Sequence, residues 1–424
     1  MKRRKQSRRW RGKKYAPVMI GMLVLLMNLA DLKNSNLISG SIICQAAERQ
    51  SENTETENNS GGTEKEKITQ TEASTVSDIL EELDLSRVQR MLDQMLGEES
   101  FSMKDMLDGL IKGEKVLSED TVQEMVHSFL FSGLEKEKSL LIKILFLILL
   151  SAVLANFADV FESGQIGDIC FYIVYLLLFI LLMDSFSSVT RSVQQTITWM
   201  AEFMRGLAPA YFLTISIAAG SSTAAVFYEG VLILTWLIQE VILNLLFPGA
   251  CLYVLISLIN NLSKEEMLGK MAELLDTAVS WGLKTLLGMV VGLQVVRGLI
   301  APVMDTLKRS ALLAAGALPG VGNAVNMVTE LVLTSAVLVR NCLGVVILFA
   351  FVAAGAGPVI HYGILSLLYR FLAAIAQPVS EKRIVDSLAT MGEGCALLLR
   401  ILFTAEILCI LDFVILMTGI GGSG

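Results

Sequence analysis

Three charged side chains lie deep within apolar stretches of the sequence: Glu240, Arg340 and Glu406. A charged side chain is costly in hydrocarbon, so such residues usually face water or the interior of a helix bundle, where they pair or mark a path for ions. We therefore expect these three residues to line a polar seam or to pair with one another.

Other chemistry is poorly supplied. The two histidines, His127 and His361, are far apart, and the six cysteines form no CxxC pair. No spacing typical of a zinc site or a metalloprotease occurs. The glycine-rich segment 316–322 lacks the Lys-Ser/Thr of a nucleotide-binding loop and indicates a helix break or a re-entrant turn. We expect no catalytic residue, metal or cofactor, and hence no enzyme.

The elements that hold these charges are long apolar segments. A membrane-spanning helix needs about 20 apolar residues. Segments that approach this length are 139–158, 168–187, 207–227, 230–247 with its continuation 248–262, 279–301, 331–356, 358–376 and 396–418. Helices and closed barrels alone satisfy backbone polar groups in lipid. The sequence therefore predicts an all-α polytopic membrane protein with about seven or eight transmembrane helices.

Four prolines are candidate helix breaks: Pro209, Pro248, Pro319 and Pro358. The first and third are 110 residues apart, and so are the second and fourth. This spacing suggests an internal repeat, 207–300 and 317–418, which would favour transporter-like architecture. A chance alignment of prolines among helix breaks is the alternative interpretation.

Small and charged residues add two further predictions. Gly288 and Gly292 form a GxxxG pattern that allows close helix approach, either within the bundle or between copies of the chain. Segments 263–276 and 379–390 alternate apolar and charged residues, which is typical of helices that lie flat in the membrane interface.

The N-terminal third divides into three segments. Residues 1–47 have nine Lys or Arg in the first 14 positions, then an apolar stretch and small residues, as in a signal peptide. An uncleaved anchor is the alternative. Residues 48–75 are a polar linker that we expect to be disordered. Residues 76–138 predict three short amphipathic helices, extracytoplasmic and resting on the membrane domain, a partner or lipid headgroups, or forming their own small bundle. The transmembrane domain follows at 139–424.

Charge bears on partners and orientation. Removal of residues 1–47 would take the net charge from −7 to about −16, which disfavours nucleic acid as a partner. Basic pairs at Lys308-Arg309 and Lys382-Arg383 are separated by two expected spans. Both pairs should therefore lie on one side, the cytoplasmic side by the positive-inside rule.

Several segments are too specific to be generic spans: Phe101-Ser102-Met103-Lys104-Asp105, Leu110-Ile111-Lys112-Gly113-Glu114, 317–323 with Glu330, 339–344, and 376–384. Their order resembles the stage III sporulation protein AE family over about 100–420. Residues 48–75 show no such likeness, and the basic start is longer than in a typical signal.

The resemblance implies a membrane subunit of a sporulation-specific secretion or feeding channel between mother cell and forespore, required for late forespore development. The implied location is the mother-cell membrane around the forespore. Implied partners are other stage III sporulation membrane proteins, a cytoplasmic secretion-type ATPase and a forespore-side partner. A secondary transporter for a small solute is the alternative, favoured by the possible repeat and the buried charges. An intramembrane enzyme is a third class, for which no site is found.

Overall fold

The computed structural model describes residues 86–96, 102–111, 138–139, 141–150, 153, 164–219, 221–263, 267–315 and 323–418. All of them belong to one compact unit, Thr75–Gly424. The predictions for the signal peptide, the linker, the third amphipathic helix and Pro319 fall outside the described residues. The described part of the chain is helical, as the sequence predicts.

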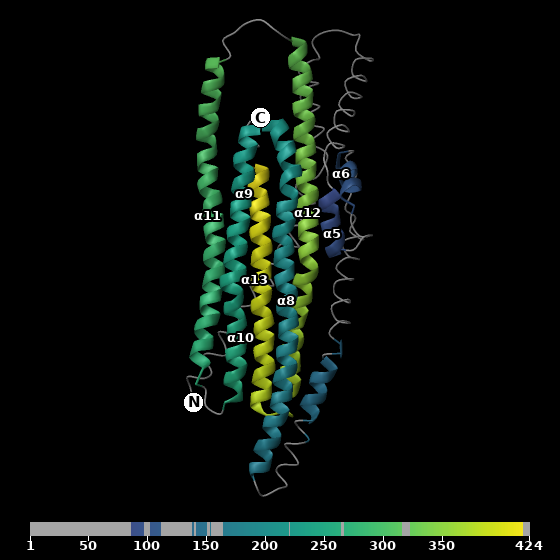
Figure 1. Cartoon of the computed structure of the whole chain (residues 1–424), viewed down its shortest axis with the longest axis vertical. Coiled ribbons are helices and arrows are strands. Elements are labelled where there is room, and N and C mark those ends of the chain that lie inside the picture. Colours follow the sequence, from purple (N-terminus) through teal and green to yellow (C-terminus); the bar gives the residue numbers. More distant parts are fainter. Residues whose placement is uncertain are drawn as a thin grey trace. The chain divides into compact units, whose positions relative to one another are not determined.

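Long helices run side by side through this unit, as Figure 1 shows. In chain order they are α8 (Gly164–Ala219), α9 (Ser221–Val241), the π-helical turn η2 (Ile242–Leu246), α10 (Phe247–Leu262), α11 (Gly269–Ala315), α12 (Asn323–Ala376) and α13 (Lys382–Thr418). The last helix, α13, contacts α8, α9, α10, α11 and α12. It is therefore the central helix of the bundle.

Five of the described helical segments are long and apolar enough to cross a membrane: Phe171–Leu207, Leu232–Leu262, Gly269–Leu293, Asn341–Ala376 and Lys382–Val414. A shorter apolar helix, Leu141–Leu150, lies within the first expected span. The expected spans 331–356 and 358–376 form one continuous helix, and 248–262 continues 230–247 through η2, as expected. The expected span 207–227 instead straddles the end of α8 and the start of α9.

The prolines interrupt these helices less than expected. Pro209 lies within α8 and Pro358 within α12, and neither helix ends there. A proline removes one backbone hydrogen bond, and neighbouring helices in a membrane bundle make this loss tolerable. Pro248 follows η2, where the N–H of Phe247 donates to the carbonyl of Ile242. The predicted break was therefore wrong at Pro209 and Pro358, whereas at Pro248 the α-helix gives way to this wider turn and α10 begins.

The two charged amphipathic segments are not separate flat helices. Residues 269–276 form the first turns of α11, and 382–390 form the first turns of α13. In the first turn of α11, the N–H of Ala272 donates to the carbonyl of Leu268, and in the turn before α13, the N–H of Ser380 donates to the carbonyl of Ala376 at 2.8 Å. Each segment therefore opens a long helix that continues into the bundle.

The basic pairs also differ from expectation. Lys308 lies near the end of α11 and Lys382 begins α13, so the single helix α12 separates them. At 1.5 Å per residue, α12 is about 80 Å long, more than twice the ~30 Å hydrocarbon core. One continuous helix places the two pairs at opposite ends of α12, because the two spans expected between them are one helix.

Two of the predicted amphipathic helices are present as α5 (Ser86–Leu96) and α6 (Met103–Ile111). α5 ends directly before Gly97. The hydroxyl of Ser102 accepts a hydrogen bond from the N–H of Asp105 and so caps the N-terminus of α6. α5 contacts α8 and α12, and α6 contacts α12. Their buried residues, Val88, Leu92, Met103 and Leu107, therefore rest on the membrane domain.

Candidate functional site

Helix α13 carries polar side chains along its whole length, and they contact all five neighbouring long helices. Its sequence places a polar residue every few positions between apolar ones, from Lys382 to Asp412. Because α13 is central, these side chains cannot reach solvent along most of the helix and must find partners inside the protein.

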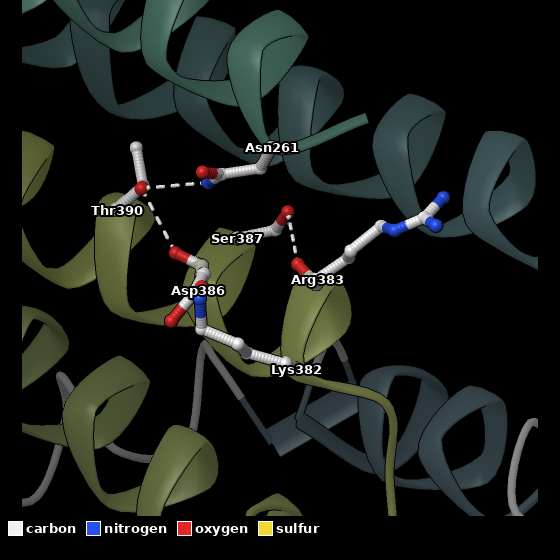
Figure 2. A network of polar contacts seen from close by, with 6 residues as sticks. All are labelled: Asn261, Lys382, Arg383, Asp386, Ser387 and Thr390. Atoms are coloured by element: carbon white, nitrogen blue, oxygen red, sulfur yellow. Dashed lines mark hydrogen bonds and ion pairs between the residues drawn. The ribbon is translucent and has the colours of Figure 1, made fainter. Parts of the chain in front are cut away.

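The first turns of α13 form a polar network, shown in Figure 2. Lys382 pairs weakly with Asp386 at 3.8 Å, and Asn261 of α10 donates to the hydroxyl of Thr390 at 3.0 Å. The hydroxyls of Ser387 and Thr390 donate to backbone carbonyls four residues earlier, both at 2.8 Å. These bonds satisfy buried hydroxyls and tie α13 to the end of α10.

The hydroxyl of Tyr175 joins three helices at the same level. It donates to the carbonyl of Leu258 in α10 and lies 2.9 Å from the hydroxyl of Ser387 in α13. Nearby, the guanidinium of Arg383 lies 4.8 Å from the centre of the Phe171 ring, a cation–π contact. The network therefore fixes α8, α10 and α13 against one another.

The middle of α13 continues this pattern. Tyr253 of α10 donates to the carboxylate of Glu393 at 2.9 Å. The guanidinium of Arg400 donates to the hydroxyl of Ser280 in α11 at 3.3 Å. One turn of α12 also approaches closely, since Ser366 donates to the carbonyl of Gly392 at 2.8 Å.

The last turns of α13 hold two buried carboxyl groups. Glu406 is 6% exposed and lies against Gly355 of α12, where an added Cβ would overlap the carboxyl group. Asp412 is fully buried, and the hydroxyl of Thr235 in α9 donates to it at 2.6 Å. Among the described residues, no basic side chain forms an ion pair with either group. These two acids make up the candidate functional site.

The structure brings together only part of the predicted polar seam. Glu406 is buried as expected, but Glu240 is exposed on the outer surface of the bundle. Helix α9 turns Glu240 outward while Thr235 and Ile238 face the core, so Glu240 does not join Glu406 inside the bundle, and its place in a polar seam stays a prediction. The side chain of Arg340 lies outside the described part of the chain, so its pairing stays a prediction.

The GxxxG pattern does not pack within the bundle. A Cβ added at Gly288 or Gly292 would meet no other atom within 4 Å, and both residues are exposed on α11. Close packing falls instead at Gly394, where a Cβ would overlap Val254, and at Gly355. The interpretation of packing within the bundle was wrong, and contact between copies stays a prediction.

Sequence reasoning did not select Asp412, Thr235 or Gly355. Asp412 could have been selected from the sequence, because it is a charged residue within the apolar segment 396–418. The clustered small residues before Pro358 were another, since small residues in a membrane helix make room for a neighbour. The pairing of Thr235 with Asp412 had no local signal. Within the described residues, no group of three or more His, Cys, Asp or Glu could hold a metal ion.

Apolar helices long enough to cross a membrane, joined by a central helix with buried polar contacts, define a polytopic helical membrane protein. The family model for stage III sporulation protein AE matches residues 101–420. The chain therefore belongs to the stage III sporulation protein AE family. A Stage III sporulation protein AE of Bacillus subtilis (strain 168) is 23% identical over 319 residues, 75% of this chain and 80% of that relative. No solved structure matches the chain.

Proposed function

We propose that the chain is a membrane subunit of a sporulation-specific channel or secretion complex between the mother cell and the forespore. The observation that carries the proposal is the family match, which runs over 101–420 and includes all five apolar helices and α6. The coarser role, in sporulation, follows from membership of the family. The channel itself, and a requirement for late forespore development, are the proposal.

The arrangement of the helices supports a definite orientation. Lys270 and Lys382 begin α11 and α13, at the end of the bundle where Asn261 meets Thr390. Lys270, Lys382 and Arg383 at this end outnumber Lys308 and Arg309 at the opposite end, and an excess of Lys and Arg favours the cytoplasmic side. α5 packs on α8 beside Trp199 and Gly206, in the half of α8 that is farther from this end, so it lies on the outer half of the bundle. We infer that residues 48–138 lie outside the cytoplasm and that the chain crosses inward through 139–158 before α8 begins.

The proposed partners follow from the same assignment. Other stage III sporulation membrane proteins and a forespore-side partner would meet the extracytoplasmic helices, where α5 exposes Arg87 and Arg90. A cytoplasmic secretion-type ATPase would meet the opposite end, where Lys270 and Lys382 are exposed. The membrane would be the mother-cell membrane that surrounds the forespore.

The test is a deletion in the organism that carries the chain, with imaging of forespore volume and of late forespore gene expression after engulfment. The proposal expects small forespores and silent late genes, both restored by the wild-type copy. A matched pair of alleles sharpens the result: Gly288→Ala should restore sporulation, whereas Gly355→Ala, which would drive a methyl group into Glu406, should not. Normal spores in the deletion strain would refute the proposal.

A secondary transporter for a small solute is the second candidate. The buried acids Glu406 and Asp412, without basic partners among the described residues, favour it, because intramembrane carboxyl groups often bind coupling ions. A transporter moves solute as a purified protein in liposomes, whereas a channel subunit needs its assembly. Solute uptake that is abolished by Asp412→Asn would favour the transporter.

A further inference from the structure

The outward face of the middle of α8 is polar throughout. Between Asp184 and Arg205, every exposed side chain is polar or charged: Asp184, Ser187, Ser188, Arg191, Ser192, Gln194, Gln195, Glu202 and Arg205. The inward side is mostly apolar, with Val193 and Phe203 fully buried. We name these nine residues the polar face of α8. At 1.5 Å per residue it is about 30 Å long.

Contacts with α12 fix the depth of this face. The hydroxyls of Ser185 and Tyr369 lie 2.6 Å apart, and the rings of Phe203 and Phe351 are 5.7 Å apart. Both partners lie inside Asn341–Ala376, the most apolar of the helices that could cross a membrane. The polar face of α8 is therefore level with the middle of a membrane-spanning segment.

Contacts with α9 and α10 indicate the same depth for the polar face of α8. The guanidinium of Arg205 donates to the side chain of Gln239 at 3.0 Å, and Phe186 and Val254 both border Gly394. Between these two levels, Leu245 is 66% and Leu252 49% exposed, as in a surface that contacts lipid. If the polar face lay beyond the membrane, these exposed leucines would also lie in water.

The exposed surface of α8 is polar only in its middle part, because the part that precedes Asp184 is different. Its exposed residues are apolar, among them Ile169, Ile173, Leu176, Leu177 and Ile180. One helix thus presents a lipid-type surface and then a polar one, while η2 and α10 beside the polar part still expose Leu245 and Leu252. Lipid at the polar face would leave several charged groups in hydrocarbon, each at a cost of about 2.5–3.5 kcal/mol or more.

We propose that the polar face of α8 lines a water-filled passage through the membrane, enclosed by further copies of this chain around a common axis. One helix cannot surround water, whereas rotation about an axis brings the same face of every copy to the centre. The face carries two acids, Asp184 and Glu202, and two bases, Arg191 and Arg205. This balance suits polar solutes without strong selection for charge. The inference rests on the proposed channel function and identifies the residues that would line the channel.

The test uses single cysteines in the full-length chain in native membranes. Ser188→Cys and Gln195→Cys lie on the polar face, and Leu252→Cys and Leu245→Cys are controls on α10 and η2 at matching depth. A membrane-impermeant cationic methanethiosulfonate reagent is added, and labelling at each site is read by mass spectrometry. The native cysteines then serve as internal references. Labelling on the polar face should be about tenfold faster or more, because the reactive thiolate forms in water and not in lipid.

Four outcomes would overturn the inference. Equal labelling of the controls would place this level of the bundle outside the membrane. Slow labelling at all four sites would show that lipid or protein covers α8. Fast labelling in purified protein but slow labelling in sporulating cells would show that another protein covers the face. In native nanodiscs, the mass should correspond to several copies, and a monomer would refute the enclosure.

The inference can fail separately from the proposed function. If the deletion blocks sporulation but Ser188→Cys is not labelled, the aqueous passage is refuted and the role in sporulation stands. If the deletion strain forms normal spores but the polar face is labelled fast and selectively, the role in sporulation is refuted and the aqueous passage stands.

Discussion

The hydroxyl of Thr235 donates a 2.6 Å hydrogen bond to Oδ2 of Asp412, and both side chains are buried between α9 and α13. The other carboxyl oxygen, Oδ1, has no hydrogen-bond partner. Asp412 is the most deeply buried acid among the described residues, and this bond is the hydrogen bond that its carboxyl group accepts. Loss of either partner would leave a buried polar group without compensation.

Thr235→Val should destabilise the protein, because it keeps the shape of the side chain and removes the donor. A buried polar group left unsatisfied costs about 1–3 kcal/mol. The apparent Tm in detergent should fall, as measured by thermal unfolding of the purified full-length protein. Thr285→Val is the matched control, since the exposed hydroxyl of Thr285 only bonds the carbonyl of Trp281 in its own helix.

A double-mutant cycle checks the pairing itself. Asp412→Leu removes the acceptor, so adding Thr235→Val to it should cost much less than Thr235→Val alone. Equal costs in both backgrounds would show that the two side chains do not act together. A Thr285→Val variant as unstable as Thr235→Val would show that any threonine loss matters equally.

Gly355→Ala should prevent normal packing of α12 on α13. A Cβ at this position would overlap the carboxyl group of Glu406, which is buried and has little room to move. Overpacking in a tight core costs about 1–3 kcal/mol. Size-exclusion profile and thermal unfolding in detergent should both deteriorate. Gly288→Ala should be neutral in the same assays, because no atom lies within 4 Å of its added Cβ.

Shortening the opposing side chain should rescue this defect. In a Glu406→Ala background, Gly355→Ala should regain most of the lost stability, since the new methyl group then meets open space. A defect that persists unchanged in the double variant would rule out the clash with Glu406 as its cause.

The fold could be predicted from the sequence at the level of class. Long apolar segments such as 341–376 indicate helices in lipid. Ser102 and Gly97 are local signals for the start of α6 and the end of α5. The span boundaries could not be predicted from Pro248 and Pro358. Tolerance of a proline depends on neighbouring helices and on a π-helical turn that forms only in the folded bundle.

The candidate site was predictable only in part. Glu406 was identifiable because a charge in an apolar run carries its own signal. The outward direction of Glu240 and the partnership of Thr235 with Asp412 depend on how α9 is rotated against α13. Hydrophobic periodicity does not reveal that rotation when a membrane helix is apolar on nearly all sides.

Trp199→Phe should loosen α5 without unfolding the bundle. The indole N–H of Trp199 donates to the carbonyl of Met91 at 2.9 Å, and its ring stacks on Phe203. Phenylalanine keeps an aromatic ring and loses the hydrogen bond, at a cost of about 1 kcal/mol. Hydrogen exchange read by mass spectrometry should become faster over 86–96 and stay unchanged over 382–414. Trp236→Phe, on the exposed side of α9, should change neither segment.

A different exchange pattern would contradict this reading of the contact. Faster exchange in both segments would mean that Trp199 supports the whole bundle. Unchanged exchange over 86–96 would mean that Val88 and Leu92 hold α5 on their own.

Cysteines at positions 308 and 382 should be labelled from opposite sides of the membrane. The single helix α12 separates the end of α11 from the start of α13, and a helix that crosses once changes sides. In protoplasts of vegetative cells that express the chain, a membrane-impermeant maleimide should reach Lys308→Cys, and it should reach Lys382→Cys only after lysis. Lys270→Cys is the control, because it begins α11 at the same end of the bundle as Lys382 and should behave in the same way. Labelling of positions 308 and 382 from one side would instead show that α12 crosses twice or not at all, and would restore the topology in which two spans lie between the basic pairs.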